Sequence, residues 1–323
     1  MSQHSVAAST ETLNDAAVAN AWRQWGRVGV ATSVSPRMSD VMVDPEPLIL
    51  GSLALAHRER RLADVAEEWL VENADLVSIG RLRALRPMLA GTDADGELSE
   101  LAARVQARTG SARWRVIVSD GPGVGNTKRD HRRGPSRKAI RVGRWYSGAT
   151  TLLQLRLGFG LGVKPDVLAV LLGTAPTMLS VRDVAEQTGY TEPAVRQALL
   201  DLADASWIES TGERTALFGA TLSTWKTVLQ LSAKKPPKWR RYTDAFAFVA
   251  RWNATSTSDS SPEISGDEVY PAVVRVRELW RDHREFFVAI GSKREPTAFG
   301  ASRPWDACAE LLQHLANWFD EKV

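Results

Sequence analysis

Residues 180–202 read S-V-R-D-V-A-E-Q-T-G-Y-T-E-P-A-V-R-Q-A-L-L-D-L, which predicts two short helices joined by a tight turn. Ser180 is a favourable N-cap residue, and Asp183 stands where an acid completes a capping box. Gly189 supplies the left-handed conformation that ends the first helix. We expect Thr191 to cap the second helix.

The apolar residues of this stretch recur at helical spacing. Ala185 must be small because the two helices cross closely there, and Val195 fills the gap between them. Leu199 and Leu202 continue the buried stripe of the second helix. This spacing of small residue, glycine and β-branched residue resembles the bacterial helix-turn-helix motif.

The next residues, A-D-A-S-W-I-E-S-T-G-E-R-T-A-L-F-G, are similar to the wing of winged helix-turn-helix transcriptional regulators. Trp207 and Ile208 begin one expected strand, residues 211–214 form the turn, and residues 215–218 return. The resemblance covers residues 164–219. It implies a mainly α fold, with a winged helix-turn-helix domain and its small β-hairpin flanked by N- and C-terminal helical domains.

The resemblance also implies double-stranded DNA as the partner, read in the major groove by helix 191–202. The buried stripe leaves five residues of that helix outward, namely Thr191, Glu192, Pro193, Arg196 and Gln197. Arg196 would bond to guanine and Gln197 to adenine, each contributing about 1–3 kcal/mol of discrimination. Thr191 would approach phosphate. An acid such as Glu192 must either read cytosine or turn away from DNA.

Two further arginines are expected to contact the DNA outside the base pairs. Arg182 would contact phosphate, and Arg214 at the wing tip would reach the backbone or the minor groove. If the protein is a homodimer, as we expect, its half-sites should lie about one helical turn apart.

A basic run precedes the motif, opposed only by Asp130. Such like charges repel one another, so we expect the segment to be extended when free. Against phosphates it would release counterions and give salt-dependent affinity, whereas the alternative is a solvated linker. The residues selected for DNA contact are Lys128, Arg129, Arg132, Arg133, Arg137 and Lys138, and Arg141 and Arg144 continue the run.

The composition is that of a globular protein with two or three domains. The chain has 323 residues, is 44% hydrophobic and has a net charge of only +3, which is weak support for a nucleic-acid partner. Its single cysteine, Cys308, excludes an internal disulfide. The sequence has no membrane-spanning stretch or signal peptide, so we expect a cytoplasmic protein without membrane contact.

Changes in composition suggest six segments. The predicted segments are 1–113, an N-terminal helical domain with a mobile tail; 114–147, a short strand at 114–118, a glycine turn and the basic linker; 148–222, the winged domain; 223–252, a basic loop and helices; 253–266, a flexible linker; and 267–323, a C-terminal helical hairpin whose aromatic stripe forms a core and in part a dimer interface.

Nothing in the sequence indicates catalysis, and we expect no catalytic residue, metal or cofactor. The run D-G-P-G-V-G-N-T-K at 120–128 superficially resembles a phosphate-binding loop, but Asp120 replaces its first glycine and Asn126 its lysine. His283, His314 and Cys308 fall on apolar helical faces, as packed residues do.

Three functions therefore stand. The first is a DNA-binding transcription regulator, with repression as the expected mode. The second is a protein-interaction module, such as an antitoxin or phage-defence component, that uses the winged fold as a scaffold. The long helical flanks and twelve tryptophans favour this second function. The third, an enzyme, has no motif in its favour.

Overall fold

The computed structural model describes residues 6–32, 40–119, 147–212, 216–230, 237–256, 269–296 and 305–321. This part of the chain is mainly helical, with one two-stranded antiparallel sheet and two isolated β-bridges. The mainly α fold class predicted from the sequence is therefore confirmed.

The helices fall into three groups along the chain. The first group is α1 Val6–Arg27, α2 Pro45–Ala54, α3 Arg61–Asn73, α4 Ile79–Leu85, α5 Ala94–Thr109 and α6 Arg115–Ser119. The second is α7 Thr151–Phe159, α8 Val163–Thr174, α9 Val181–Thr188, α10 Glu192–Asp204, the strands β1 Glu209–Thr211 and β2 Leu217–Gly219, and α11 Leu222–Val228. The third is α12 Tyr242–Ser256, α13 Val269–Asp282, α14 Arg284–Ala289 and α15 Asp306–Phe319.

Helices from both ends of the chain share one hydrophobic core, here called the terminal core, which joins α1 to α6 with α12 to α15. α1 packs along α15, where Asn20 and Arg23 donate side-chain hydrogen bonds to the carbonyl oxygen of Phe319 over 2.6 and 2.8 Å. Arg27 pairs with Glu321 through both guanidinium nitrogens, at 2.7 and 2.8 Å. The two ends, which the sequence suggested as separate domains, thus cover each other's apolar faces.

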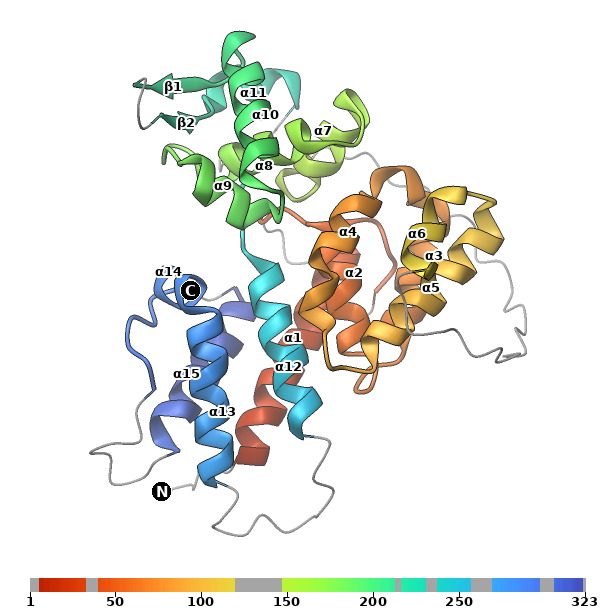
Figure 1. Ribbon diagram of the computed structural model, residues 1–323, viewed down its shortest axis with the longest axis vertical. Helices are drawn as coiled ribbons and strands as arrows, with labels where there is room; N and C mark the ends of the chain where they lie inside the picture. Colours follow the sequence, from red (N-terminus) through yellow and green to blue (C-terminus); the bar gives the residue numbers. More distant parts are fainter. Residues whose placement is uncertain are drawn as a thin grey trace.

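α12 lies in the middle of the terminal core, against α1, α2 and α13 (Figure 1). Phe246 of α12 packs directly on Gly51 of α2, where an added Cβ would come within 2.5 Å of the ring. Asn14 of α1 and Asn253 of α12 exchange buried amide hydrogen bonds of 3.1 and 2.8 Å. The close approach of α2 and α12 therefore requires a glycine.

The second group of helices, with β1 and β2, forms the middle unit, which has its own core. α8 contacts α7, α9 and α10, and Val167, Leu168 and Leu171 on it are at most 1% exposed. β1 and β2 pair with Ser210 opposite Phe218. Leu179, just before α9, exchanges two backbone hydrogen bonds of 2.8 Å with Phe218, so a third short segment joins the hairpin.

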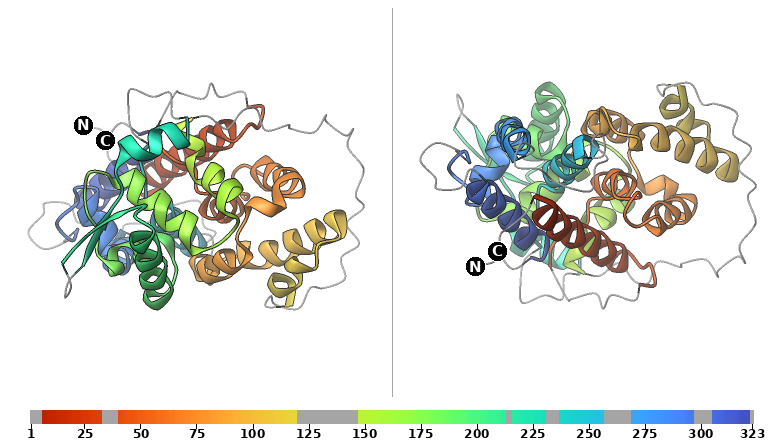
Figure 2. Two further views of the ribbon diagram at one scale, coloured as in Figure 1. Left: turned by 90° about the horizontal axis from the view of Figure 1, so that it is seen from above. Right: turned by 90° about the horizontal axis from the view of Figure 1, so that it is seen from below.

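The middle unit lies at one end of the molecule's long axis, and the terminal helices fill the other end (Figure 1). Seen from above, α10 lies at the outer edge of this unit (Figure 2). The view from below shows α1 running beside the C-terminal helices (Figure 2). The second helix of the motif therefore lies on the surface.

Two secondary-structure predictions were wrong. The expected strand at residues 114–118 is a 3-10 turn followed by α6, with Trp114 and Ile117 buried three residues apart on one helical face. A short apolar run has no period that separates strand from helix. The C-terminal hairpin predicted for residues 267–323 contains three helices rather than two in the described part, because His283 separates α13 from α14.

The structure also shows where Trp239 lies and whether any described helix could cross a membrane. Trp239, set among basic residues in the sequence, is buried against Gly173 of α8 and so serves the core of the middle unit. No helix in the described ranges is both long and apolar enough to cross a membrane.

Candidate functional site

α9 begins and ends with the capping geometry that the sequence predicted. The hydroxyl of Ser180 accepts a hydrogen bond from the N–H of Asp183 at 3.2 Å, and the Asp183 carboxylate accepts one from the N–H of Ser180 at 2.9 Å. Gly189 has a φ of 74° and donates its N–H to the carbonyl of Ala185 at 2.8 Å. The capping box and the glycine C-cap are confirmed.

The start of α10 differs from its prediction. Thr191 occupies the N-cap position, but its side chain makes no capping hydrogen bond, so the predicted side-chain cap is wrong. Pro193 is the second residue of the helix and has no N–H, which removes one of the two donors that such a cap would bind. Val195, Leu199 and Leu202 are at most 2% exposed, as predicted, and fix the inward face.

The outward face of α10 is exposed as expected. Arg196 has no hydrogen bond or ion pair within the described part of the chain. Gln197 donates its side-chain amide to Asp201 at 2.7 Å, and Lys164 pairs with the same carboxylate at 2.8 Å. The exposed residues that the sequence selected are Thr191, Glu192, Pro193, Arg196 and Gln197.

Charge divides α10 into two halves. Its N-terminal half carries Glu192 and Arg196, whereas its C-terminal half carries Asp201 and Asp204. The one cationic side chain on α10 itself is Arg196, in the N-terminal half. Lys164, which pairs with Asp201, belongs to α8. A polyanion would therefore approach α10 at its N-terminal half.

Arg182 is already engaged on the surface of α9. Its guanidinium pairs with Glu186 at 2.8 Å and with Glu285 of α14 at 3.2 Å. The hydrogen bond that Arg182 donates to Glu186 contributes most to the raised pKa of Arg182. Contact with a phosphate remains a prediction, and it would require Arg182 to leave both carboxylates.

The remaining selected residues lie outside the described ranges. They are Arg214 at the predicted wing tip and the basic residues Lys128, Arg129, Arg132, Arg133, Arg137 and Lys138. The glycine turn at 120–128 also lies there.

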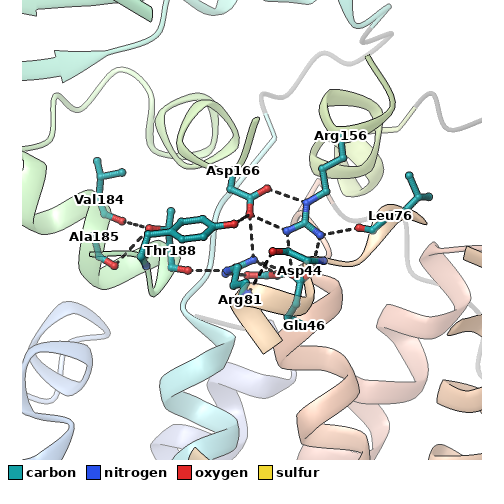
Figure 3. A network of polar contacts seen from close by, with 11 residues as sticks. Asp44, Glu46, Leu76, Arg81, Arg156, Asp166, Val184, Ala185 and Thr188 are labelled. Carbon is teal, nitrogen blue, oxygen red and sulfur yellow. Dashed lines mark hydrogen bonds and ion pairs between the residues drawn. The ribbon is translucent and has the colours of Figure 1, made fainter. Parts of the chain in front are cut away.

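Beneath the turn between α9 and α10 lies a buried ion network that the sequence did not reveal (Figure 3). It joins the terminal core to the middle unit, and its side chains are at most 4% exposed. Its five charged members are Asp44 and Glu46 at the start of α2, Arg81 of α4, Arg156 of α7 and Asp166 of α8.

Glu46 lies at the centre of the buried ion network. It accepts hydrogen bonds from Arg156 at 2.7 and 2.9 Å, from Arg81 at 2.9 Å and from the N–H of Ser78 at 2.7 Å. Burial acts to raise the pKa of Glu46, but Arg156 and Arg81 outweigh it and hold that pKa at about 2. Glu46 is thus an anion that both arginines share.

Asp166 and Asp44 each rely mainly on one arginine. Asp166 accepts two hydrogen bonds of 2.8 Å from Arg156 and one of 2.9 Å from the hydroxyl of Tyr190. Asp44 accepts hydrogen bonds from Arg81 through both oxygens, one of them at 2.6 Å. Three carboxylates facing two guanidiniums leave one surplus negative charge, which is costly inside a protein.

The surplus charge falls on Asp44, because its only hydrogen-bond donor among the described residues is Arg81, whereas Asp166 also accepts from Tyr190 and lies 3.9 Å from Arg81. Burial raises the pKa of Asp44 to about 6, although Arg81 acts to lower it. As pH falls through about 6, Asp44 therefore takes up a proton and the surplus negative charge is removed.

The network also reaches the turn between α9 and α10. Arg81 Nε donates a hydrogen bond of 2.6 Å to the carbonyl oxygen of Thr188, the last residue of α9. Leu85, one turn further along α4, lies against Gly189, where an added Cβ would come within 2.7 Å of its Cδ2. Arg81 and Leu85 both belong to α4, and Figure 3 shows the hydrogen bond from Arg81 to Thr188.

A cleft of about 660 Å³ separates α9 from α14 and α15 on the other side of the middle unit. Trp239, Phe286 and Trp318 line it, together with three acids and three arginines. The balanced charges favour neither an anionic nor a cationic ligand.

The described residues contain no group of three or more side chains suited to hold a metal ion. Cys308 is buried, which raises its pKa to about 12 and makes the nucleophilic thiolate unfavourable.

When the chain is compared with protein-family models, curated proteins and solved structures, none of them matches it.

Weak signals of the network are present in the sequence. Arg156 is a lone charge within the leucine-rich run at 151–157, and Asp166 opens the apolar helix α8. Glu46 stands between two prolines, directly before an apolar run. A charge that an apolar run carries inward requires a buried partner, but the sequence does not say which.

Proposed function

We propose that the middle unit is a winged helix-turn-helix domain and that the protein is a DNA-binding regulator. The order of α8, α9, α10 and the β1–β2 hairpin supports this proposal, as does the backbone pairing of Leu179 with Phe218. The capped turn at Gly189 supports it as well.

The single observation that carries the proposal is the state of Arg196. This arginine is exposed, has no partner among the described residues, and lies in the N-terminal half of a surface helix. Residues in that half of a recognition helix contact base edges in the major groove. A free guanidinium there can bond to guanine through two N–H groups.

The neighbours of Arg196 define how α10 would enter the groove. Gln197 would reach adenine only after leaving Asp201. Asp201 and Asp204 would be kept away from phosphates, so the helix would enter with its N-terminal end first. The wing residue Arg214 and the basic run from Lys128 would then contact the sugar-phosphate backbone.

The test is selection of bound fragments from random DNA, followed by affinity measurements with Arg196→Ala. We expect a loss of about 5- to 100-fold on the selected site and little loss on random DNA. Arg115→Ala is the matched control, since Arg115 is also an exposed helical arginine but lies on α6, outside the middle unit. Equal losses on both DNAs, or none, would show that Arg196 reads no base.

A second function, a protein-interaction module, is favoured by an exposed aromatic pair. Phe159 and Trp207 are each 43% exposed, with their rings 5.2 Å apart and Trp225 beneath both. Aromatic side chains of this kind anchor protein interfaces. A groove of about 410 Å³ beside Phe159 runs along α10.

The second function has its own measurement. We expect Phe159→Ser with Trp207→Ser to abolish copurification with the product of a neighbouring gene, while Tyr270→Ser, at another exposed aromatic, leaves it intact. Failure to select any DNA would favour this function over the first. Selected DNA without copurification would favour the first.

A further inference from the structure

α4 holds the turn between α9 and α10 by two contacts of different kinds. One is the hydrogen bond of 2.6 Å from Arg81 Nε to the carbonyl of Thr188. The other is the packing of Leu85 against Gly189. Thr188 ends α9, so its carbonyl is among the last four of the helix, which lack a partner within it.

Arg81 is itself held from the opposite side. Its terminal nitrogens donate to Asp44 and Glu46, and its side chain is 0% exposed. The guanidinium is planar and rigid, so carboxylates that fix its terminal nitrogens also fix the direction of Nε–H. The position of the Thr188 carbonyl therefore follows from the position of two acids on the terminal core.

The distance along the chain from this carbonyl to the outward face of α10 is short. Thr188, Gly189, Tyr190 and Thr191 are consecutive, and α10 begins at the next residue. Tyr190, within the same turn, adds a second tie, because its hydroxyl donates to Asp166 at 2.9 Å. The turn thus contacts the buried ion network at both of its ends.

We propose that Arg81 is a positioning residue: it transmits the geometry of the terminal core to the turn and so sets the angle at which α10 is presented. The inference concerns the presentation of α10 and rests on the proposed DNA-binding function only for its second readout. The N-terminal helices α2 and α4 then hold α10 in a fixed orientation.

Arg81→Lys is the most direct test. A lysine can still pair with Asp44 and Glu46, but it has no Nε–H to give to Thr188. Hydrogen exchange, measured well below the unfolding midpoint, should speed up by about tenfold or more at amides 188–195, because a charge-assisted hydrogen bond is lost. The full-length protein is used throughout.

Arg86→Lys is the matched control. Arg86 is a largely buried arginine only five residues further on, but its partners Asp95, Ser99 and the carbonyl of Ile117 all belong to the terminal core. We expect amides 188–195 to exchange at the wild-type rate in this variant. Equal acceleration in both variants would mean general loosening and would overturn the proposal, as would no acceleration in Arg81→Lys.

Leu85→Ala gives a second route if Arg81→Lys does not fold. It leaves all five charges of the network in place and removes the packing on Gly189. Amides 188–195 should exchange faster than in Leu89→Ala, a deletion at a buried leucine of the same segment. If Leu89→Ala has the larger effect there, α4 does not hold the turn.

DNA affinity separates this proposal from the proposed function. Arg81→Lys should lose at least fivefold on the selected site at a temperature where it is folded, whereas Arg86→Lys should not. If wild type binds no DNA, the DNA-binding function fails while the exchange data still decide the role of Arg81. Faster exchange with unchanged affinity would leave the turn held by Arg81 but would refute its role in presenting α10.

Discussion

The middle unit is tied to the rest of the molecule on two sides, and the ties differ in kind. Towards α2 and α4 lies the buried ion network, whose five charges are almost inaccessible to water. Towards α14 lies the ion pair of Arg182 with Glu285, whose side chains are 68% and 56% exposed beside an open cleft. The first kind of tie cannot exchange its partners for water, whereas the second can.

The difference teaches which side of the middle unit is able to give way. Removing one partner of a buried pair leaves an uncompensated charge in a dry site. An exposed pair is screened by salt and replaced by hydration at little cost. We therefore expect the α4 side to remain fixed and the α14 side to respond to solution conditions.

Arg156→Met should have the largest effect. The change leaves Glu46 and Asp166 without their shared guanidinium, which is expected to lower the free energy of unfolding by about 3–5 kcal/mol. Urea denaturation measures the change. Arg104→Met, at a partly exposed pair with Glu67, is the control and should cost at most about 1 kcal/mol. Similar losses in both variants would erase the distinction between the two kinds of tie.

Asp44→Asn should have a pH-dependent effect of intermediate size. Because the pKa of Asp44 is raised to about 6, folded protein retains a proton between about pH 4 and 6 that unfolded protein has lost. Its contribution to stability therefore falls as pH rises through this window. Asparagine has no such loss, so the variant should gain on wild type by about 2 kcal/mol between pH 4.5 and 7.

The opposite shift of Glu46 does not obscure this measurement. Because the pKa of Glu46 is lowered to about 2, its contribution to stability is lost only as pH falls below about 4.5. This lies outside the measured range of pH 4.5 to 7. Denaturation of both proteins at intervals of half a pH unit gives the difference directly. A difference independent of pH would assign the surplus charge to another carboxylate.

Arg182→Ala should have the smallest effect. Arg182 is largely exposed, so we expect its loss to leave the denaturation midpoint within replicate error at physiological salt. Glu285→Ala is the companion variant, because it removes the contact with α14 but keeps Glu186. A midpoint shift as large as that of Arg156→Met would mean that the α14 side is as rigid as the other.

The sequence predicted the local half of this site and missed the non-local half. Ser180, Asp183 and Gly189 act on neighbours within four residues, so their types and spacing specify the turn directly. Even there, the side-chain cap expected of Thr191 is absent, and Pro193 removes one of the two N–H groups that it could have bound. The inward leucines of α10 followed from helical spacing alone.

The non-local half could not be predicted because its contacts join residues far apart in the chain. Arg156 lies 110 residues from Glu46, and Arg81 lies 107 residues from Thr188. A single charged residue in a helix usually faces water, and no spacing rule connects it to a distant acid. The same holds for α1 and α15, whose apolar stripes were clear but whose pairing was not.

That pairing has a consequence for the order in which the protein forms during translation. The ribosome makes α1 long before α15, yet Leu13, Ala17 and Trp25 of α1 belong to the core that α15 completes. The nascent chain therefore carries an apolar face of α1 that stays uncovered until α15 has been made, and such exposed surface favours aggregation and chaperone binding. A premature stop before residue 306 would leave the face of α1 that packs on α15 uncovered in the released product.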